Sequence, residues 1–303
     1  MPIHVVGNVC VDTSFRLERL PQPGETHNAA ATSDGPGGKG ANQAVAAART
    51  GAVVTLWAPV GEDAASERMA ALLSGEIPGL RLSRLAFVCD RSVILIDRNG
   101  ENVIVTAAAC ASAFDPLAMT ALEETWRSGD MLLMQGNLGL VATVACLKAA
   151  RAAGLFTVFN PSPLPKLLLD LSMVSLLVVN RPEAEALTGV ADAEGAARQL
   201  LALGAESVIV TLGSAGALVL EASSADALRI LADDVEAVDA SGAGDCFAGT
   251  LAGLLAQGVA LSVAARLATQ AAGIAVGRAG TLASFPSRAE LSALTETLKL
   301  ENV

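Results

Sequence analysis

Short runs of β-branched and other apolar residues alternate along this chain with longer alanine-rich segments. Such alternation is typical of an α/β fold, in which a mostly parallel central sheet is flanked by helices on both faces. Ligands of these sheets bind beyond the carboxyl ends of the strands. The expected strands are residues 3–6, 53–58, 131–135, 156–159, 176–179 and 208–212. The expected helices are 41–49, 64–74, 116–127, 141–153, 182–188, 193–203, 245–257, 262–276 and 288–298.

Two segments interrupt this alternation. Residues 13–34 form a polar, extended stretch that contains Leu-Pro-Gln-Pro-Gly-Glu, and residues 93–106 have the pattern of a hairpin with Asn99-Gly100 at its turn. We therefore predict a small β lid from 13–34 and 93–106, able to close over a substrate and exclude water. The main domain would then comprise residues 1–12, 35–92 and 107–303.

The composition excludes several classes of protein. The net charge of −11 opposes non-specific nucleic-acid binding, and two histidines make a histidine-based triad or metal site improbable. No run of 18 apolar residues and no signal-peptide pattern is present, so we expect neither a membrane span nor secretion. The cysteines are scattered without a CxxC pair, which predicts free thiols in a reducing cytoplasm; they are Cys10, Cys89, Cys110, Cys146 and Cys246.

The segment 239–249, Asp-Ala-Ser-Gly-Ala-Gly-Asp-Cys-Phe-Ala-Gly, carries the strongest chemical signal. Gly242, Ala243 and Gly244 lead into Asp245 and then into an apolar run typical of a helix. A helix start presents unpaired N–H groups and a partial positive charge, and small residues let an anion approach them. With Asp245 as a proton acceptor, this pattern suggests phosphoryl transfer. The alternative is that Asp245 only caps the helix or interacts with its dipole.

A second glycine-rich segment, 35–40, formally matches GxGxxG. The stretch before it, 27–34, is a poor strand candidate, and no Ser or Thr follows Lys39, so neither a dinucleotide fingerprint nor a Walker A loop is expected. The glycines would let backbone N–H groups meet a polyhydroxy ligand near Lys39 and Asn42, or simply form a flexible turn. Asp12 follows the first strand, where its carboxylate either holds two sugar hydroxyls or caps a turn.

Two further strand ends carry polar residues. Asn180 and Glu183 lie three residues apart at a helix start, where they could orient the waters of a phosphate-bound Mg²⁺ or form a capping box. The loop 211–216, Thr-Leu-Gly-Ser-Ala-Gly, is rich in small residues and suits a nucleotide.

Together these motifs resemble, in order, those of the ribokinase-like sugar kinases, also called the phosphofructokinase-B family. Residues 37–48 resemble that family's first signature, 239–247 its second, and Asn180-x-x-Glu183 its metal and phosphate motif. The resemblance implies a ribokinase-like fold and ATP-dependent transfer of the γ-phosphate to a hydroxymethyl group of a small sugar.

The resemblance also implies roles for individual residues. Asp245 would be the base, and the Gly242–Gly244 amides would hold the charge that builds on the transferring phosphate. The sugar would be bound by Asp12, Gly38, Lys39, Asn42 and Asn137, and the nucleotide by Asn180, Thr211, Gly213, Ser214, Gly216 and Gly244. Glu183 would bind Mg²⁺ or orient its waters. A K⁺ site, largely of backbone carbonyls, would involve Asp239, Ser241, Ala275, Arg278, Gly280 and Ser284.

Two positions depart from ribokinase itself. Cys10 stands where ribokinase tends to carry Asn, and Asn137 aligns where it carries Glu. A thiol is a poor partner for a sugar hydroxyl, and Asn lacks a full negative charge. A deoxy sugar or another small polyol is therefore expected as readily as ribose. A nucleoside kinase of the same fold and a non-catalytic sugar- or nucleotide-binding protein are the alternatives. An exposed lid edge would favour a homodimer.

Overall fold

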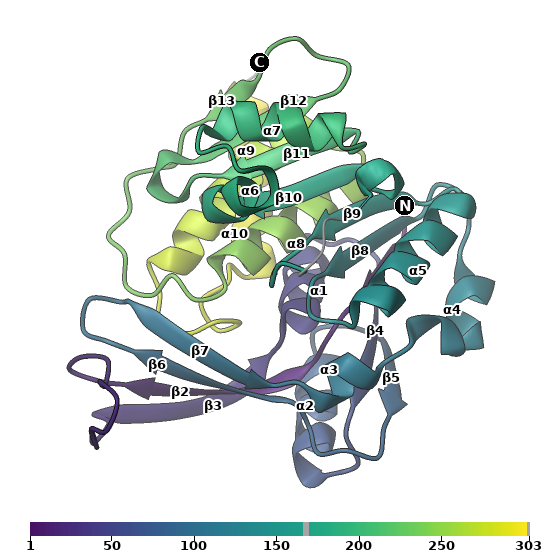
Figure 1. The fold of residues 1–303 in the computed structure, drawn as a ribbon. Helices are drawn as coiled ribbons and strands as arrows, with labels where there is room; N and C mark the ends of the chain where they lie inside the picture. The colour runs from purple at the N-terminus through teal and green to yellow at the C-terminus, as the bar shows by residue number, and fades with distance from the viewer. Residues whose placement is uncertain (166–169, 302–303) are drawn as a thin grey trace.

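The computed structural model describes residues 1–165 and 170–301, which contain one large and one small sheet (Figure 1). The large sheet has nine strands in the order β13-β12-β11-β10-β9-β8-β1-β4-β5. Its strands are β1 (Ile3–Val6), β4 (Val54–Val60), β5 (Gly79–Arg84), β8 (Met131–Gln135), β9 (Phe156–Asn160), β10 (Leu176–Asn180), β11 (Ser207–Thr211), β12 (Ala217–Glu221) and β13 (Leu228–Ile230).

All six predicted strands form, and the neighbours from β5 to β11 are parallel. The pattern did not predict β5, β12 or β13. Beyond β11, the strand β12 pairs antiparallel with β11, and β13 pairs antiparallel with β12. Antiparallel neighbours need no crossover helix between them, so the strand–helix alternation does not reveal these two strands. β5 lies at the opposite edge and carries the charged residues Arg81 and Arg84, unlike the apolar central strands. The predicted α/β fold is confirmed.

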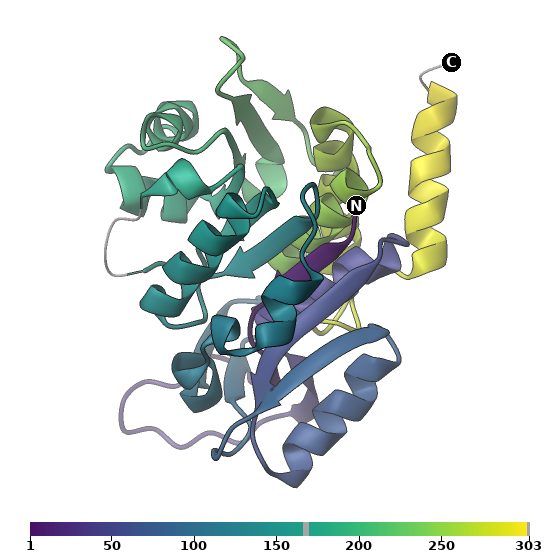
Figure 2. The same cartoon turned by 90° about the vertical axis from the view of Figure 1, so that its right-hand side faces the viewer.

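Side chains of the central strands alternate between two apolar layers. In β8, Met131 and Leu133 join one core cluster, whereas Leu132 and Met134 join the other. The first layer is covered by α1, α2, α8 and α9, with α10 outside it (Figure 2), and the second by α4, α5, α6 and α7. The helices are α1 (Lys39–Arg49), α2 (Ala64–Ser74), α3 (Ala109–Ala113), α4 (Thr120–Thr125), α5 (Leu140–Ala152), α6 (Arg181–Thr188), α7 (Ala193–Ala202), α8 (Ala243–Ala256), α9 (Leu261–Val276) and α10 (Arg288–Glu301).

The helix predicted over 116–127 is interrupted. A 3₁₀ turn, Pro116–Ala118, precedes α4, and Met119 between them has a non-helical ψ of 87°. The Asp115 side chain caps the 3₁₀ turn by accepting from Leu117 N–H. Two short elements therefore replace the single expected helix. Among the described helices, none has the length and apolar character needed to cross a membrane.

The small sheet has the order β3-β2-β6-β7 and projects from one side of the main body (Figure 1). The hairpin predicted around Asn99-Gly100 forms from β6 and β7, and β2 pairs parallel to β6 and antiparallel to β3. We did not expect a strand in 27–34, and this prediction was wrong for residues 31–34, which belong to β3. As an edge strand β3 is largely exposed, so polar residues and Pro36 are tolerated there. The strands are β2 (Cys10–Arg16), β3 (Ala31–Gly37), β6 (Arg91–Ile96) and β7 (Asn102–Ala107).

Candidate active site

A row of polar residues ends four neighbouring parallel strands of the large sheet. Gln135 ends β8 and pairs in register with Asn160, which ends β9; Asn180 ends β10 and pairs with Thr211, which ends β11. Because the strands run parallel, these four side chains lie together at the carboxyl ends of the strands. Open α/β sheets bind their ligands at that end.

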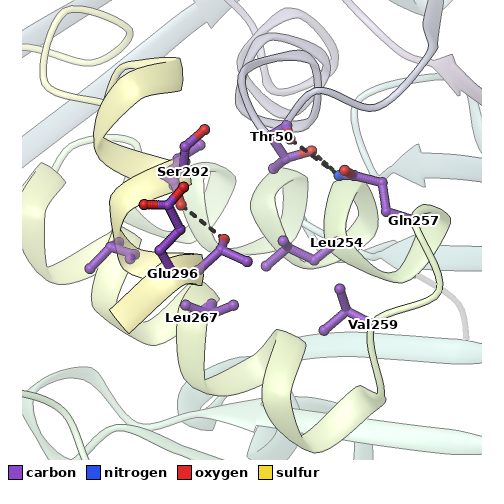
Figure 3. Close-up of a pocket in the computed structure, with 10 residues that line it drawn as sticks. Thr50, Leu254, Gln257, Val259, Leu267, Ser292 and Glu296 are labelled. Carbon is purple, nitrogen blue, oxygen red and sulfur yellow. Dashed lines mark hydrogen bonds between the residues drawn. The ribbon is translucent and has the colours of Figure 1, made fainter. Parts of the chain in front are cut away.

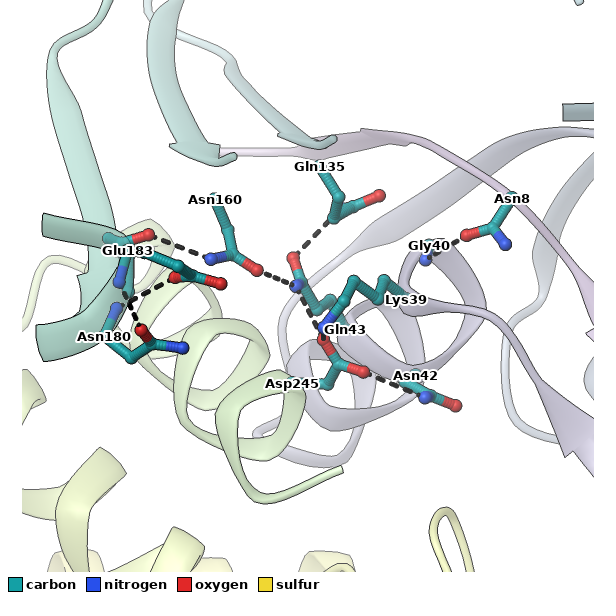
Figure 4. Close-up of polar contacts among 11 residues, drawn as sticks. Asn8, Lys39, Gly40, Asn42, Gln43, Gln135, Asn160, Asn180, Glu183 and Asp245 are labelled. Carbon is teal, nitrogen blue, oxygen red and sulfur yellow. Dashed lines mark hydrogen bonds and ion pairs between the residues drawn. The ribbon is translucent and has the colours of Figure 1, made fainter. Parts of the chain in front are cut away.

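Asp245 lies in the first turn of α8, and only 4% of the residue is exposed. Its Oδ2 accepts a hydrogen bond of 3.0 Å from Asn42 Nδ2, and its Oδ1 accepts one of 2.9 Å from Gln43 Nε2. The ammonium group of Lys39 lies 3.5 Å from Oδ1 (Figure 4). Two segments some 200 residues apart in sequence, the start of α1 and the start of α8, therefore meet at this carboxylate.

The close approach of α1 and α8 depends on glycine. A Cβ atom at Gly249 would lie 2.3 Å from the backbone oxygen of Gln43, and one at Gly253 would lie 2.8 Å from the backbone oxygen of Ala47. Any larger residue there would push the helices apart. This packing brings the first turns of both helices to one place.

The helix start at α8 is open to solvent and lacks a side-chain cap. Gly242 is the N-cap with φ of +78°, and a Cβ atom built on Gly244 would meet nothing within 4 Å. Asp245 accepts from side chains of α1 instead of capping its own helix, so the capping alternative is not what the structure contains. Ala243 N–H donates to the Ala240 carbonyl at 3.3 Å, whereas the N–H groups of Gly242 and Gly244 have no partner among the described residues. These two N–H groups and the open space suit an anion.

Asp12 in β2 is the second carboxylate near this place. The Cys10 thiol donates to Asp12 Oδ1 at 3.1 Å, and Cys10 Sγ lies 3.4 Å from Ser92 Oγ. Burial raises the pKa of Asp12 and the negative charge of Asp245 acts in the same direction, whereas Lys39 and the hydrogen bonds from Cys10 and Ser92 lower it. Asp12, Lys39 and Asp245 are therefore within electrostatic reach of one another.

The glycines of the segment 35–40 permit close backbone contacts, and its first part lies in β3. Gly38 has φ of +93°, and a Cβ atom on it would lie 2.8 Å from the Asn8 backbone oxygen. Gly40 N–H donates to Asn8 Oδ1 at 3.3 Å. The turn thus packs tightly against the chain that follows β1, instead of being flexible.

Three buried amide oxygens near the strand ends have no hydrogen-bond partner among the described residues: Asn42 Oδ1, Gln135 Oε1 and Asn137 Oδ1. Buried polar atoms are nearly always paired, so such oxygens are suited to accept from a bound molecule. Asn42 and Asn137 are two of the residues predicted to bind the sugar.

Asn180 and Glu183 form the capping box that was the alternative interpretation. Glu183 N–H donates to Asn180 Oδ1 at 2.8 Å, and Asn180 N–H donates to Glu183 Oε2 at 2.9 Å. Within the described part of the chain, Glu183 Oε1 accepts no hydrogen bond and stays available to a bound group. Figure 4 places both residues beside the Asn160 end of the polar network.

The predicted nucleotide loop is a tight turn between β11 and β12. Leu212 N–H donates to the Gly216 carbonyl at 2.7 Å, and both Gly213 and Gly216 have positive φ. Ser214 is exposed, and Thr211 Oγ1 donates to the Val179 carbonyl at 3.4 Å. The loop lies at the strand end next to Asn180.

The segments predicted to form a cation site also meet. Both oxygens of the buried Asp239 carboxylate are engaged: Oδ1 accepts from Ser241 N–H at 3.0 Å, and Oδ2 from Gly280 N–H and the Arg16 guanidinium at 3.1 Å each. Ala275 ends the buried part of α9, and the buried Ser284 donates its hydroxyl to the Thr281 carbonyl. The exposed Arg278 side chain instead pairs with Glu290.

The sequence did not predict the buried amides that surround Asp245. Gln43, Gln135 and Asn160 form a hydrogen-bonded group with it (Figure 4). Gln43 lies within the glycine-rich signature beside Asn42. Gln135 ends one predicted strand and Asn160 directly follows another, which is the only sequence signal for them.

A separate cavity of about 350 Å³ lies near the other end of α8, between that helix, the start of α9 and α10 (Figure 3). Leu254, Leu267 and Leu291 give it apolar walls, and Gln257 and Glu296 are among its polar lining residues. None of the predicted site residues lines it. It is therefore distinct from the polar strand ends.

Comparison with known proteins agrees with this geometry. The family model described as "pfkB family carbohydrate kinase" matches residues 2–288. The chain is 32% identical to a ribokinase of Schizosaccharomyces pombe, covering 95% of this chain and 96% of that protein. It is 31% identical to a deoxyribokinase of Salmonella typhi, with the same coverage. The crystal structure of ribokinase from Cryptococcus neoformans var. grubii serotype A in complex with ADP is 30% identical, with a TM-score of 0.81, and covers 97% of this chain and 98% of that one.

Proposed function

This chain belongs to the pfkB family of carbohydrate kinases, and from that premise we propose that it transfers the γ-phosphate of ATP to a hydroxymethyl group of a small sugar. The observation that carries the proposal is the position of Asp245: buried, held by Asn42 and Gln43, and at an open helix start. The predicted resemblance to ribokinase-like kinases and the class of carbohydrate kinase are confirmed.

In the proposed reaction the hydroxymethyl oxygen attacks the γ-phosphorus of ATP. The bond from that phosphorus to the β,γ-bridging oxygen breaks, and its electron pair leaves with ADP. The hydroxyl proton passes to Asp245, and the products are ADP and a sugar phosphate. The amides of Gly242, Ala243 and Gly244 would stabilise the charge on the transferring group; the space at Gly244 is open, and Ala243 N–H would have to exchange its 3.3 Å hydrogen bond to the Ala240 carbonyl for one to the phosphate.

For the sugar we propose Asp12, Gly38, Lys39, Asn42 and Asn137 as ligands. Two of them, Asn42 and Asn137, offer the unpaired buried oxygens described above, to which sugar hydroxyls can donate. Asp12 accepts a hydrogen bond from the Cys10 thiol at 3.1 Å, and we propose that the small sheet that carries Asp12 is the lid. Closure of this lid would exclude water from the phosphoryl transfer.

The identity of the sugar depends on Cys10 and Asn137. The Cys10 thiol already donates its proton in a hydrogen bond to Asp12, and burial raises its pKa well above the usual range. The neutral thiol is therefore a weak hydrogen-bond partner for a substrate hydroxyl. We therefore propose a ribose-like or deoxy sugar. The Salmonella relative named a deoxyribokinase supports the latter.

A coupled ADP-release assay with ribose, 2-deoxyribose, other small sugars and a nucleoside panel tests this function. We expect turnover with a ribose-like or deoxy sugar and none with nucleosides. Turnover with nucleosides alone would favour a nucleoside kinase of the same fold. Binding of a sugar with no ADP release from any substrate would favour a non-catalytic binding protein.

For the nucleotide we propose Asn180, Thr211, Gly213, Ser214, Gly216 and Gly244, and ATP as the phosphate donor. The ADP bound to the Cryptococcus ribokinase supports this choice. The described residues contain no group of three or more His, Cys, Asp or Glu side chains able to hold a metal ion by themselves. Mg²⁺ usually binds one or two carboxylates together with phosphates and waters. Glu183 fits that role, because its Oε1 accepts no hydrogen bond from the residues that the structure describes. Bound Mg²⁺ would neutralise charge on the phosphates.

Glu183→Gln is expected to raise the Mg²⁺ concentration needed for half-maximal activity by about 10-fold, because the variant loses one of the few charged ligands such a site uses. The capping hydrogen bond to Asn180 N–H survives in Gln, so the helix should stay intact. Glu185→Gln, an exposed change two residues along the same helix, is the matched control. An unchanged Mg²⁺ titration for Glu183→Gln would remove the assigned role.

For K⁺ we propose the segments of Asp239, Ser241, Ala275, Arg278, Gly280 and Ser284. The chain fits such an ion through backbone carbonyls, since the Asp239 carboxylate is already engaged by Ser241, Gly280 and Arg16. K⁺ should then raise both the turnover and the melting temperature relative to tetramethylammonium at equal ionic strength. If neither changes, the K⁺ site is absent.

For the quaternary structure we propose a homodimer through the lid. β7 is an edge strand whose six residues are all exposed, with Val103, Ile104 and Val105 among them, and unpaired edges invite a partner. Light scattering that finds only monomer would exclude it.

For the location we propose a reducing compartment such as the cytoplasm, because all five cysteines are free and buried. Cell fractionation tests this location.

A further inference from the structure

The Gln43 side chain on α1 is fully buried and uses both of its N–H groups. Nε2 donates to Asp245 Oδ1 at 2.9 Å and to Asn160 Oδ1 at 3.0 Å, while Oε1 accepts from Gln135 Nε2 at 2.9 Å (Figure 4). If the amide were flipped, its oxygen would face the acceptor oxygens of Asp245 and Asn160, and its NH₂ group would face the donor NH₂ group of Gln135. The surrounding groups therefore fix one orientation of this amide.

The amide group is anchored in the large sheet. Gln135 and Asn160 end the adjacent strands β8 and β9, and Asn160 Nδ2 donates to the Val178 carbonyl in β10 at 2.9 Å. On the other side, Gly249 of α8 packs against the Gln43 backbone so closely that a Cβ atom does not fit. Hydrogen bonds therefore hold the amide, and close packing against α8 holds its backbone.

We propose that Gln43 is a positioning residue that holds the Asp245 carboxylate for proton transfer; this inference rests on the proposed function. The other two donors to Asp245, Lys39 and Asn42, are also the proposed sugar ligands, and Lys39 is partly exposed. Gln43 is wholly buried among protein groups and is committed to Asp245. It therefore fixes Oδ1 relative to the strand ends, independently of whether sugar is bound.

The experiment is a double-mutant cycle of Gln43→Met with Asp245→Asn in the full-length protein. Methionine has a similar length and no donors. Gln43→Met should lower kcat about 10- to 100-fold, since small misplacements of reacting groups cost about that much. The KM values for sugar and ATP should change less than about 3-fold. In the Asp245→Asn background, Gln43→Met should lower the residual kcat by less than about 3-fold, because it acts through Asp245.

Gln257→Met is the matched control. Gln257 follows the C-terminal end of α8 and also makes side-chain hydrogen bonds, to Thr50 Oγ1 at 3.0 Å and to the Gly253 carbonyl at 2.9 Å. The same chemical change there should leave kcat unaltered. If Gln43→Met does not fold, Gln43→Asn replaces it in the double-mutant cycle with Asp245→Asn. Asparagine keeps the amide but is one methylene shorter, so the amide lies farther from Asp245.

The outcomes separate this proposal from the one on which it rests. A wild-type kcat for Gln43→Met, or an equal loss with and without Asp245, overturns the positioning role. An equal rise of both KM values at constant kcat would also overturn it. Near-normal turnover of Asp245→Asn alone would instead remove the proposed base, and the role of Gln43 with it.

Discussion

Asp245→Asn is expected to lower kcat by about 10³-fold while the Kd for ATP stays within about 3-fold of the wild-type value. Asparagine matches the shape of aspartate but does not accept the hydroxyl proton, and a positioned general base typically contributes about 10²- to 10⁴-fold. ATP binding should persist because the proposed nucleotide residues lie at the ends of β10 and β11 and in the open turn of α8. ADP release and calorimetric titration with ATP measure the two quantities.

Asp130→Asn is the control for loss of a buried carboxylate. Asp130 is also buried, but it precedes β8 and bonds to Arg127 N–H, so it lies at the opposite edge of the sheet from Gln135. This variant should lose stability and keep its kcat. If Asp245→Asn turns over substrate almost as fast as the wild type, Asp245 is not the base.

The central strands were predictable because both of their faces are buried. A strand covered by helices on both sides needs a continuous apolar run, which is easily recognised, as in Met131–Gln135. The edge strand β3 is largely exposed and β5 is partly exposed, and their polar residues interrupt the apolar pattern by which a strand is recognised. β12 is as apolar as the central strands, yet it follows a short turn and no helix.

The site was predictable only in part. The glycines and Asp245 stand out because few residue types suit an anion at a helix start. The meeting of α1 with α8 was suggested by family resemblance alone. Its physical cause, the absent side chains at Gly249 and Gly253, shows only in three dimensions.

The buried amides escaped prediction for a related reason. Gln135 and Asn160 are uncharged residues at the ends of apolar strands, where a single amide is common in any protein. Their importance comes from both bonding to Gln43, which lies about 90 and 120 residues earlier in the chain. Likewise, the spacing of Asn180 and Glu183 fitted both a capping box and a metal ligand. The capping box forms, and no described residue donates a hydrogen bond to Glu183 Oε1.

Gly37→Ala is expected to raise the sugar KM by about 10- to 100-fold with little change in ATP affinity. Gly37 ends β3 opposite Cys10, and a Cβ atom on it would lie closer than 3.0 Å to three carboxyl atoms of Asp12. The added methyl must displace that carboxylate. Hydrogen bonds to charged groups contribute about 1.5–3 kcal/mol, which corresponds to this loss of affinity. Steady-state kinetics with varied sugar at saturating ATP measures it.

Gly35→Ala tests whether the effect comes from Asp12 and not from a weaker strand. Gly35 lies two residues earlier in β3, in register with Asp12 itself, yet a Cβ atom there meets nothing within 4 Å. Both variants make the same backbone less flexible, but only Gly37→Ala disturbs the carboxylate. The sugar KM of Gly35→Ala should therefore equal that of the wild type, and its melting temperature should not fall. Equal KM values for the two variants would mean that Asp12 does not bind the sugar.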